Sequence, residues 1–161
     1  MKKIKIHIDK CKEKQTKNVL LEEKYYTTTN HLSYINMCYL DNNFIEKKTV
    51  IKDLKKKLSG YRNQDTKKKR FDANKFIKID ELLEKLVISK LSCYYCKKQC
   101  FLFCKEKRNM GQWTLDRIDN NIGHYNDNVV ISCLACNLQK RCRNKDHFKF
   151  AKQMNIVKKY Y

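Results

Sequence analysis

This 161-residue chain has no proline, three glycines and few acidic side chains. The scarcity of proline and glycine excludes a collagen-like chain. No apolar run approaches the ~18 residues that a membrane-spanning helix needs, and the charged first ten residues lack the apolar stretch of a secretory signal. We therefore expect an intracellular protein (cytoplasmic or nuclear) in a reducing compartment, neither secreted nor membrane-bound.

The shortage of acidic groups leaves a large positive charge. The 37 Lys and Arg exceed the 17 Asp and Glu by enough to give a net charge of +20. Such a surface repels itself, and nucleic acid relieves the repulsion because its phosphates bind cations and release counterions. The alternative is that the basic runs are only solvated surface. The predicted nucleic-acid contacts are Lys67, Lys68, Lys69, Arg70, Arg117, Lys140, Arg141 and Arg143.

Cysteine, in contrast, is abundant. The nine cysteines are an odd number without a secretory signal, which favours thiols or metal binding over disulfides. Two C-x-x-C pairs, Cys93 with Cys96 and Cys133 with Cys136, predict a tetrahedral structural Zn²⁺ site. Cys100 and Cys104 follow at helical spacing, so exchange with one of these ligands or a second site remains an alternative. We expect the other three, Cys11, Cys38 and Cys142, to be free thiols or small apolar side chains.

The first half of the chain contains weaker secondary-structure signals. Alternating apolar and polar residues predict a half-buried strand over residues 1–10. Helical spacing predicts a helix over residues 49–58, ended by Ser59-Gly60. Residues 61–75 then predict a polar, basic loop.

Two further helices flank the cysteine-rich part of the chain. Residues 80–91 predict a helix capped by Asp80 that leads directly to Cys93. Asp146 is expected to cap a last helix. Its predicted apolar face contains Phe150, Met154 and Val157, with His147 as a packed or capping residue.

These patterns divide the chain into three segments and predict an α+β fold. Residues 1–78 form a basic N-terminal extension of mixed helix and strand, expected to contact DNA or to mediate homodimerisation. Residues 79–145 form a metal-containing module, and residues 146–161 form a C-terminal helix. Within the module, residues 114–141 predict a strand ending at Asp116, a polar turn, a second strand over residues 128–132, and a helix that begins near Cys136.

The order of motifs over roughly residues 79–145 resembles the HNH (His-Me finger) endonuclease superfamily in its zinc-containing form. The matching motifs are C-x-x-C, L-D-R-I-D-N, G-H, D-N-V-V and C-x-x-C-N followed by K-R. The resemblance implies a small ββα-metal module held together by a four-cysteine zinc site. It also implies Mg²⁺- or Mn²⁺-dependent hydrolysis of phosphodiester bonds, with double-stranded or branched DNA as the expected partner.

The resemblance also assigns roles to individual residues. Asp116 and Asn137 would hold the catalytic divalent ion, since one carboxylate and one amide oxygen suit a hard cation that keeps several waters. Asn128 would tie the hairpin loop together or orient the base. The alternative is that these residues form ordinary turns and that Asn137 caps a helix.

One departure from the family concerns the general base. The family has a His directly after the first-strand Asp, whereas this chain has Arg117, which cannot deprotonate water at neutral pH. His124, or Asp119 or a phosphate-bound water, could act instead, and Arg117 could hold the scissile phosphate. A third alternative is that no base functions. The chain would then be a non-catalytic zinc module that binds nucleic acid, or a structural protein.

Overall fold

The computed structural model describes residues 21–154 of the chain, so the strand expected over residues 1–10 lies outside the described residues. This part has a mixed α+β fold, as predicted. Its elements are η1 (Glu23–Tyr26, a 3₁₀ helix), α1 (Thr28–Tyr39), α2 (Lys47–Lys67), α3 (Ile79–Ile88), β1 (Trp113–Arg117), η2 (Asn126–Asn128, 3₁₀), β2 (Val129–Cys133), α4 (Leu134–Lys140) and α5 (Lys145–Gln153). None of these helices is long and apolar enough to cross a membrane.

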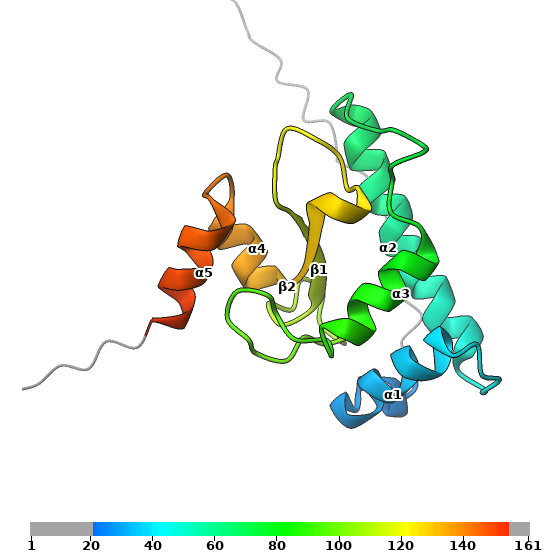
Figure 1. The fold of residues 1–161 in the computed structure, drawn as a ribbon. Coiled ribbons are helices and arrows are strands. Elements are labelled where there is room, and N and C mark those ends of the chain that lie inside the picture. The colour runs from blue at the N-terminus through cyan, green and yellow to red at the C-terminus, as the bar shows by residue number, and fades with distance from the viewer. Residues whose placement is uncertain (1–20, 155–161) are drawn as a thin grey trace, which may run out of the picture.

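A two-stranded antiparallel hairpin stands at the centre. Trp113 pairs with Cys133 at one end, and Arg117 pairs with Val129 at the other. Helices α1, α2 and α3 lie on one side of the hairpin, and α4 and α5 lie on the other (Figure 1). The predicted hairpin with a following helix is therefore present, although α4 begins two residues before Cys136.

Helix α2 is longer than the sequence predicted. It continues through Ser59-Gly60 to Lys67, so the prediction of a loop from residue 61 was wrong for its first seven residues. The reason is burial. Tyr61 is half-buried and Asp65 is fully buried, and both extend the helix face that already buries Leu54 and Leu58. Packing of this face outweighs the cost of about 1 kcal/mol that a glycine imposes on a helix interior.

The two flanking helices also differ in detail. Helix α3 begins at Ile79 with Lys78 as its N-cap, and Glu81 accepts a hydrogen bond from the Lys78 backbone N–H, so Asp80 is not the cap. Helix α5 is capped by Asn144 rather than Asp146. The predicted apolar face of α5 was wrong: Phe148 is buried against Tyr95, whereas Phe150, Met154 and His147 are exposed, and Val157 lies outside the described residues.

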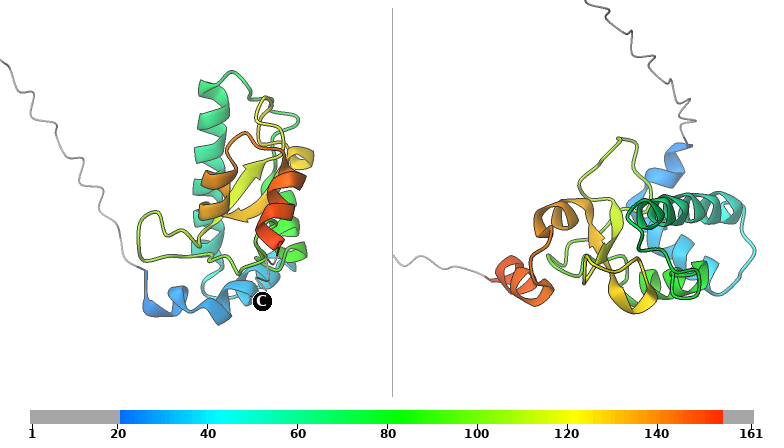
Figure 2. Two further views of the ribbon diagram at one scale, coloured as in Figure 1. Left: turned by 90° about the vertical axis from the view of Figure 1, so that its left-hand side faces the viewer. Right: turned by 90° about the horizontal axis from the view of Figure 1, so that it is seen from above.

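One hydrophobic core runs through the described residues from Tyr25 to Phe148. It includes α1, α2 and α3 as well as the hairpin, so no break in the core coincides with the boundary predicted at residue 78. Figure 2 shows α2 beside the hairpin in both additional views. The helix therefore presents side chains to the strands that carry the predicted site.

Candidate functional site

The four predicted zinc ligands form one cluster. The sulfur atoms of Cys93, Cys96, Cys133 and Cys136 all lie within 4.8 Å of one another. A tetrahedral Zn²⁺ with Zn–S bonds of about 2.3 Å requires sulfur–sulfur separations of about 3.8 Å. The Cys96 and Cys133 sulfurs are 3.9 Å apart. The donor set and its spacing are therefore compatible with a structural zinc site.

Local structure explains why these cysteines meet. The turn after Cys93 is closed by the backbone N–H of Lys97, which donates to the Cys93 carbonyl at 3.0 Å, with Lys97 at a left-handed φ of 60°. Cys133 ends β2 and caps α4, so Cys136 follows one helical turn later. Cys100 is buried but is not among the four clustered sulfurs, and Cys104 is half-buried in another part of the surface.

A separate cavity of about 530 Å³ lies between α2, β1 and α4. Four of the predicted catalytic residues line it: Asp116, Arg117, His124 and Asn137. Two others, Asp119 and Asn128, do not. The cavity also contains Tyr61 and Gln64 from α2, which the sequence analysis did not place at the site.

Asp116 is buried at the wall of this cavity. Its Oδ2 accepts a hydrogen bond from the Tyr95 hydroxyl and lies 3.2 Å from the Lys140 ammonium nitrogen. Burial raises the pKa of Asp116, although Tyr95 and Lys140 oppose the rise by stabilising the carboxylate. No described residue donates a hydrogen bond to the second oxygen, Oδ1, which leaves it available as a ligand.

Asn137 lies in α4 with its amide group oriented by two hydrogen bonds. Its Nδ2 donates to the Thr114 hydroxyl at 3.0 Å and to the Leu115 carbonyl at 3.2 Å. The alternative of a helix cap does not hold, because Cys133 is the N-cap of α4. The orientation leaves the Asn137 Oδ1 without a described partner. One carboxylate and one amide oxygen on the same cavity form a donor set that fits Mg²⁺ or Mn²⁺.

His124 is held by a carboxylate from α2. Asp65 Oδ1 lies 2.9 Å from the His124 Nδ1, and Asp65 Oδ2 accepts the His124 backbone N–H at 2.7 Å. This arrangement favours the tautomer with a proton on Nδ1, which leaves Nε2 free to accept a proton. Burial lowers the pKa of His124, while Asp65 opposes the decrease. Asp65 itself is fully buried.

Arg117 connects the same groups. Its guanidinium lies 3.7 Å from Asp65 Oδ1 and donates to the Ile122 carbonyl at 3.4 Å. Arg117 is half-buried and lines the cavity. It therefore places a positive charge on the cavity wall where the resembled family has its histidine.

Asn128 ties the hairpin loop together. Its Oδ1 accepts the Asp119 backbone N–H at 2.8 Å, and its Nδ2 donates to the carbonyls of Asp119 and Gly123. The carboxylate of Asp119 is exposed and accepts the Asn121 backbone N–H in a local turn. Asn128 thus has the loop-tying geometry that the resemblance implies, and Asp119 is positioned as a turn residue.

The predicted nucleic-acid contacts differ in how exposed they are. The exposed ones are Lys67, Lys68 and Lys69 at the end of α2, and Arg141 and Arg143 after α4. Two others, Arg70 and Arg117, are half-buried. Lys140 is different, and its prediction as a phosphate contact was wrong. Its side chain is fully buried, pairs with Asp116 and donates to the Arg117 carbonyl at 2.7 Å, so it has no access to a phosphate.

Sequence reasoning missed Asp65, Tyr61 and Tyr95. The signal for Tyr61 and Asp65 was their position, because both continue the helical spacing of three or four residues that begins with Leu54 and Leu58. Tyr95 lies within the first C-x-x-C pair, where only the cysteines attract attention. Its contact with Asp116 connects the cysteine cluster to the cavity.

No protein-family model matches the chain, and no solved structure matches it. An uncharacterized protein of Acanthamoeba polyphaga mimivirus is 42% identical over 65 residues. The match covers 40% of this chain and only 10% of the mimivirus protein. The comparison therefore identifies a viral relative of part of the chain and assigns no activity.

Proposed function

We propose that the protein is a metal-dependent endonuclease that hydrolyses phosphodiester bonds in DNA by an HNH-type mechanism, with β1, β2 and α4 as its ββα-metal module. One observation carries the proposal: Asp116, Arg117, His124 and Asn137 line one cavity although they come from a strand, a loop and a helix. A set of turn-forming residues has no reason to converge in this way. The four-cysteine cluster beside the cavity agrees with a structural zinc that holds the hairpin against α4.

In this mechanism, residues of the chain remove a proton from the attacking water and offset charge on the phosphate. His124 accepts a proton from the attacking water at Nε2, while Asp65 holds Nδ1–H and stabilises the imidazolium that forms. Arg117 offsets negative charge on the phosphate. Mg²⁺ or Mn²⁺, held by Asp116 and Asn137, would stabilise the charge that develops on the phosphate and on the leaving oxygen. His124 is favoured over Asp119 as the base because only His124 lines the cavity.

The test is a titration of Mg²⁺ and Mn²⁺ against cleavage of duplex, branched and single-stranded DNA. We expect cleavage that requires the added metal and falls at least ~10²-fold in His124→Ala, Asp116→Asn and Asn137→Ala. Asp119→Ala is the matched control, because it removes an exposed carboxylate from the same loop outside the cavity, and it should retain cleavage. Absence of cleavage on every substrate, or an equal loss in the control, would contradict the proposal.

A second candidate is a non-catalytic zinc module that binds nucleic acid. The ion pair of Asp116 with buried Lys140 favours it, since the predicted metal ligand already has a cationic neighbour. Arg117 in place of the family's histidine points the same way. This candidate predicts binding that Asp116→Asn leaves unchanged and cleavage in no variant except Arg117→His, which would restore the family's base.

A further inference from the structure

A second depression, of about 580 Å³, lies beside the first part of α2. We call it the α2 groove. Lys52, Asp53, Lys56 and Lys57 of α2 line one wall, and residues 102–108 with Gln112 line the other. None of these residues is among the predicted nucleic-acid contacts, and none takes part in the chemistry proposed for the cavity.

The α2 groove and the cavity lie one after the other along the same seam between α2 and β1. Three contacts define the seam: Lys57 Nζ donates to the Trp113 carbonyl at 2.7 Å, the Leu115 N–H donates to the Tyr61 hydroxyl at 3.0 Å, and Arg117 lies 3.7 Å from Asp65. From one contact to the next, the position advances by four residues on α2 and by two residues on β1. Four residues span about 6 Å of a helix and two residues span about 6.6 Å of a strand, so α2 and β1 keep matching positions along the seam.

Positive charge continues along this seam on both sides of the cavity. From Lys52 in the groove to Lys67 at the end of α2 the helix axis advances about 22 Å. Between these ends lies the cavity, with Gln64 about 12 Å beyond Lys56. An extended polyanion fits such a line of charges, whereas a small anion would fill only one part of it.

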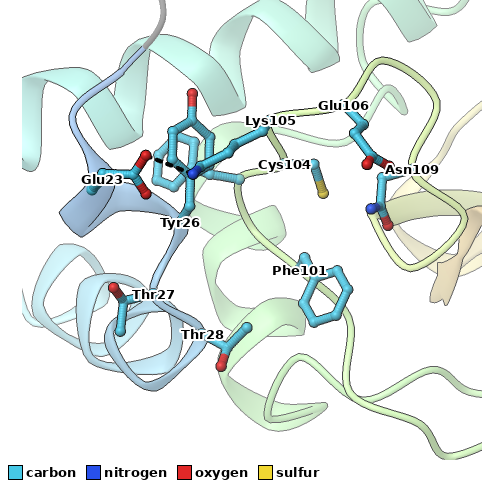
Figure 3. Close-up of a pocket in the computed structure, with 10 residues that line it drawn as sticks. Glu23, Tyr26, Thr27, Thr28, Phe101, Cys104, Lys105, Glu106 and Asn109 are labelled. Atoms are coloured by element: carbon cyan, nitrogen blue, oxygen red, sulfur yellow. Dashed lines mark hydrogen bonds and ion pairs between the residues drawn. The ribbon is translucent and has the colours of Figure 1, made fainter.

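The basic side chains of the groove differ in whether they already have an ion-pair or hydrogen-bond partner within the protein. Lys105 pairs with Glu23 at 2.6 Å in a neighbouring depression, and Figure 3 shows it directed toward that carboxylate. Lys57 is engaged by the Trp113 carbonyl. By contrast, four basic side chains of the groove have no ion pair within 4.0 Å among residues 21–154: Lys52, Lys56, Lys107 and Arg108. These four exceed the two acidic groups that line the groove, Asp53 and Glu106.

We propose that the α2 groove binds the sugar-phosphate backbone of the same DNA strand whose phosphate occupies the cavity. The two contacts would lie about 12 Å apart along α2, which is the advance of the helix axis from Lys56 to Gln64. The inference rests on the proposed function for the identity of the cavity's occupant. It adds the direction of the strand, which runs along α2, and a set of contacts that act on binding rather than on chemistry.

The experiment compares two triple variants of the full chain that lose the same charge. Lys52→Gln/Lys56→Gln/Lys107→Gln removes charge from the groove. Lys85→Gln/Lys90→Gln/Lys98→Gln removes it from α3 and the segment that follows. Binding of a fluorescent 30-base-pair duplex is measured by anisotropy at several salt concentrations without added divalent metal. Thermal melting checks that both variants fold.

We expect the groove variant to bind at least 10-fold more weakly at 0.15 M salt. Its slope of log K against log salt should decrease in magnitude by about 2 to 3, since each lost phosphate contact contributes ~0.9. The control should lose less than threefold. Equal losses in both variants would show an effect of net charge alone and would overturn the proposal, as would unchanged binding by the groove variant.

A failure of the groove can be distinguished from a failure of the nuclease proposal. Asp116→Asn is expected to abolish cleavage and to keep the salt slope of the wild type, because Asp116 does not line the groove. If no substrate is cut but the groove variant alone loses affinity, the groove stands and the nuclease proposal fails. If cleavage is found and the two triple variants bind alike, the reverse holds.

Discussion

The cysteine cluster and the cavity lie next to each other but are built in different ways. All four sulfurs come from two short motifs, each of which places its pair by local backbone geometry. The cavity needs α2, whose Asp65 precedes its partner His124 by 59 residues. The cluster should therefore respond to changes in its own motifs, whereas the cavity should respond to changes in helices that carry no motif.

The largest effect is expected from the cysteine cluster. Cys136→Ser removes one of the four predicted zinc ligands, and structural zinc contributes about 10–16 kcal/mol of apparent binding energy to small domains. We expect loss of bound zinc and a cooperative loss of the hairpin and α4. Zinc content by atomic spectroscopy and thermal unfolding by circular dichroism measure both. Cys142→Ser changes an exposed cysteine outside the cluster, so it should affect neither the zinc content nor the thermal unfolding.

The cavity should lose stability without losing zinc when its buried ion pair is broken. Lys140→Met leaves the Asp116 carboxylate buried beside Tyr95 without its cation, which typically costs about 3–5 kcal/mol. Urea unfolding measures the loss, with zinc content expected to remain that of the wild type. The double variant Lys140→Met/Asp116→Leu should recover most of the stability, because it removes both charges. No recovery would mean that the pair does not act as a unit.

What could be predicted from the sequence follows the same division. The C-x-x-C spacing was enough to predict the cysteine cluster. The turn signals around Gly123, between two apolar runs, were enough to predict the hairpin, although β1 ends at Arg117, one residue beyond the predicted end at Asp116. These features depend on residues close in the chain, where backbone geometry leaves few alternatives.

The part that could not be predicted depends on tertiary burial. Ser59-Gly60 is a reasonable helix end, and only the packing of Tyr61 against β1 shows why the helix continues. A lone Asp65 in a polar stretch carries no sign that it will bind His124. Lys140 could not be distinguished from the exposed Arg141 by its neighbours in the chain, because its burial is set by Asp116 across the module.

Substitution of two glycines, Gly123 and Gly60, tests the contact between α2 and the hairpin loop, because only Gly123 lies at that contact. A Cβ at Gly123 would lie 2.7 Å from the Arg70 carbonyl oxygen and 2.9 Å from Asp65 Oδ2, whereas a Cβ at Gly60 meets nothing within 4 Å. Gly123→Ala should therefore destabilise the protein by about 1–3 kcal/mol and weaken the Asp65–His124 contact. Gly60→Ala should stabilise it by about 0.5–1 kcal/mol, since alanine is the better helix former.

Denaturant unfolding of both glycine variants measures these changes, and cleavage rates show whether the cavity is affected. Gly123→Ala should lower cleavage and Gly60→Ala should leave it unchanged. Equal stability of the two variants would mean that the loop does not depend on its close approach to α2.

The smallest expected effect is the pH dependence of stability that His124 contributes at the cavity. Burial lowers the pKa of His124 below its ordinary value of 6.5, against the opposing charge of Asp65 and with Arg117 and the Tyr61 ring also facing it. The unfolded chain then binds this proton more readily than the folded chain. Stability contributed by His124 is complete above pH 6.5 and is lost as the pH falls below it. At pH 5.5 the loss is at most about 1.4 kcal/mol, which corresponds to one pH unit.

Buried His31 has a pKa lowered in the same direction, so the wild type alone cannot assign this effect. The measurement is the free energy of unfolding at pH 7.5 and 5.5 for the wild type and for His124→Gln, which keeps a hydrogen-bonding side chain beside Asp65. We expect a smaller decrease in the variant. Zinc content should stay the same in both proteins at both values of pH. An identical decrease would mean that His124 titrates as it does in the unfolded chain, so that burial in the cavity does not favour its neutral form.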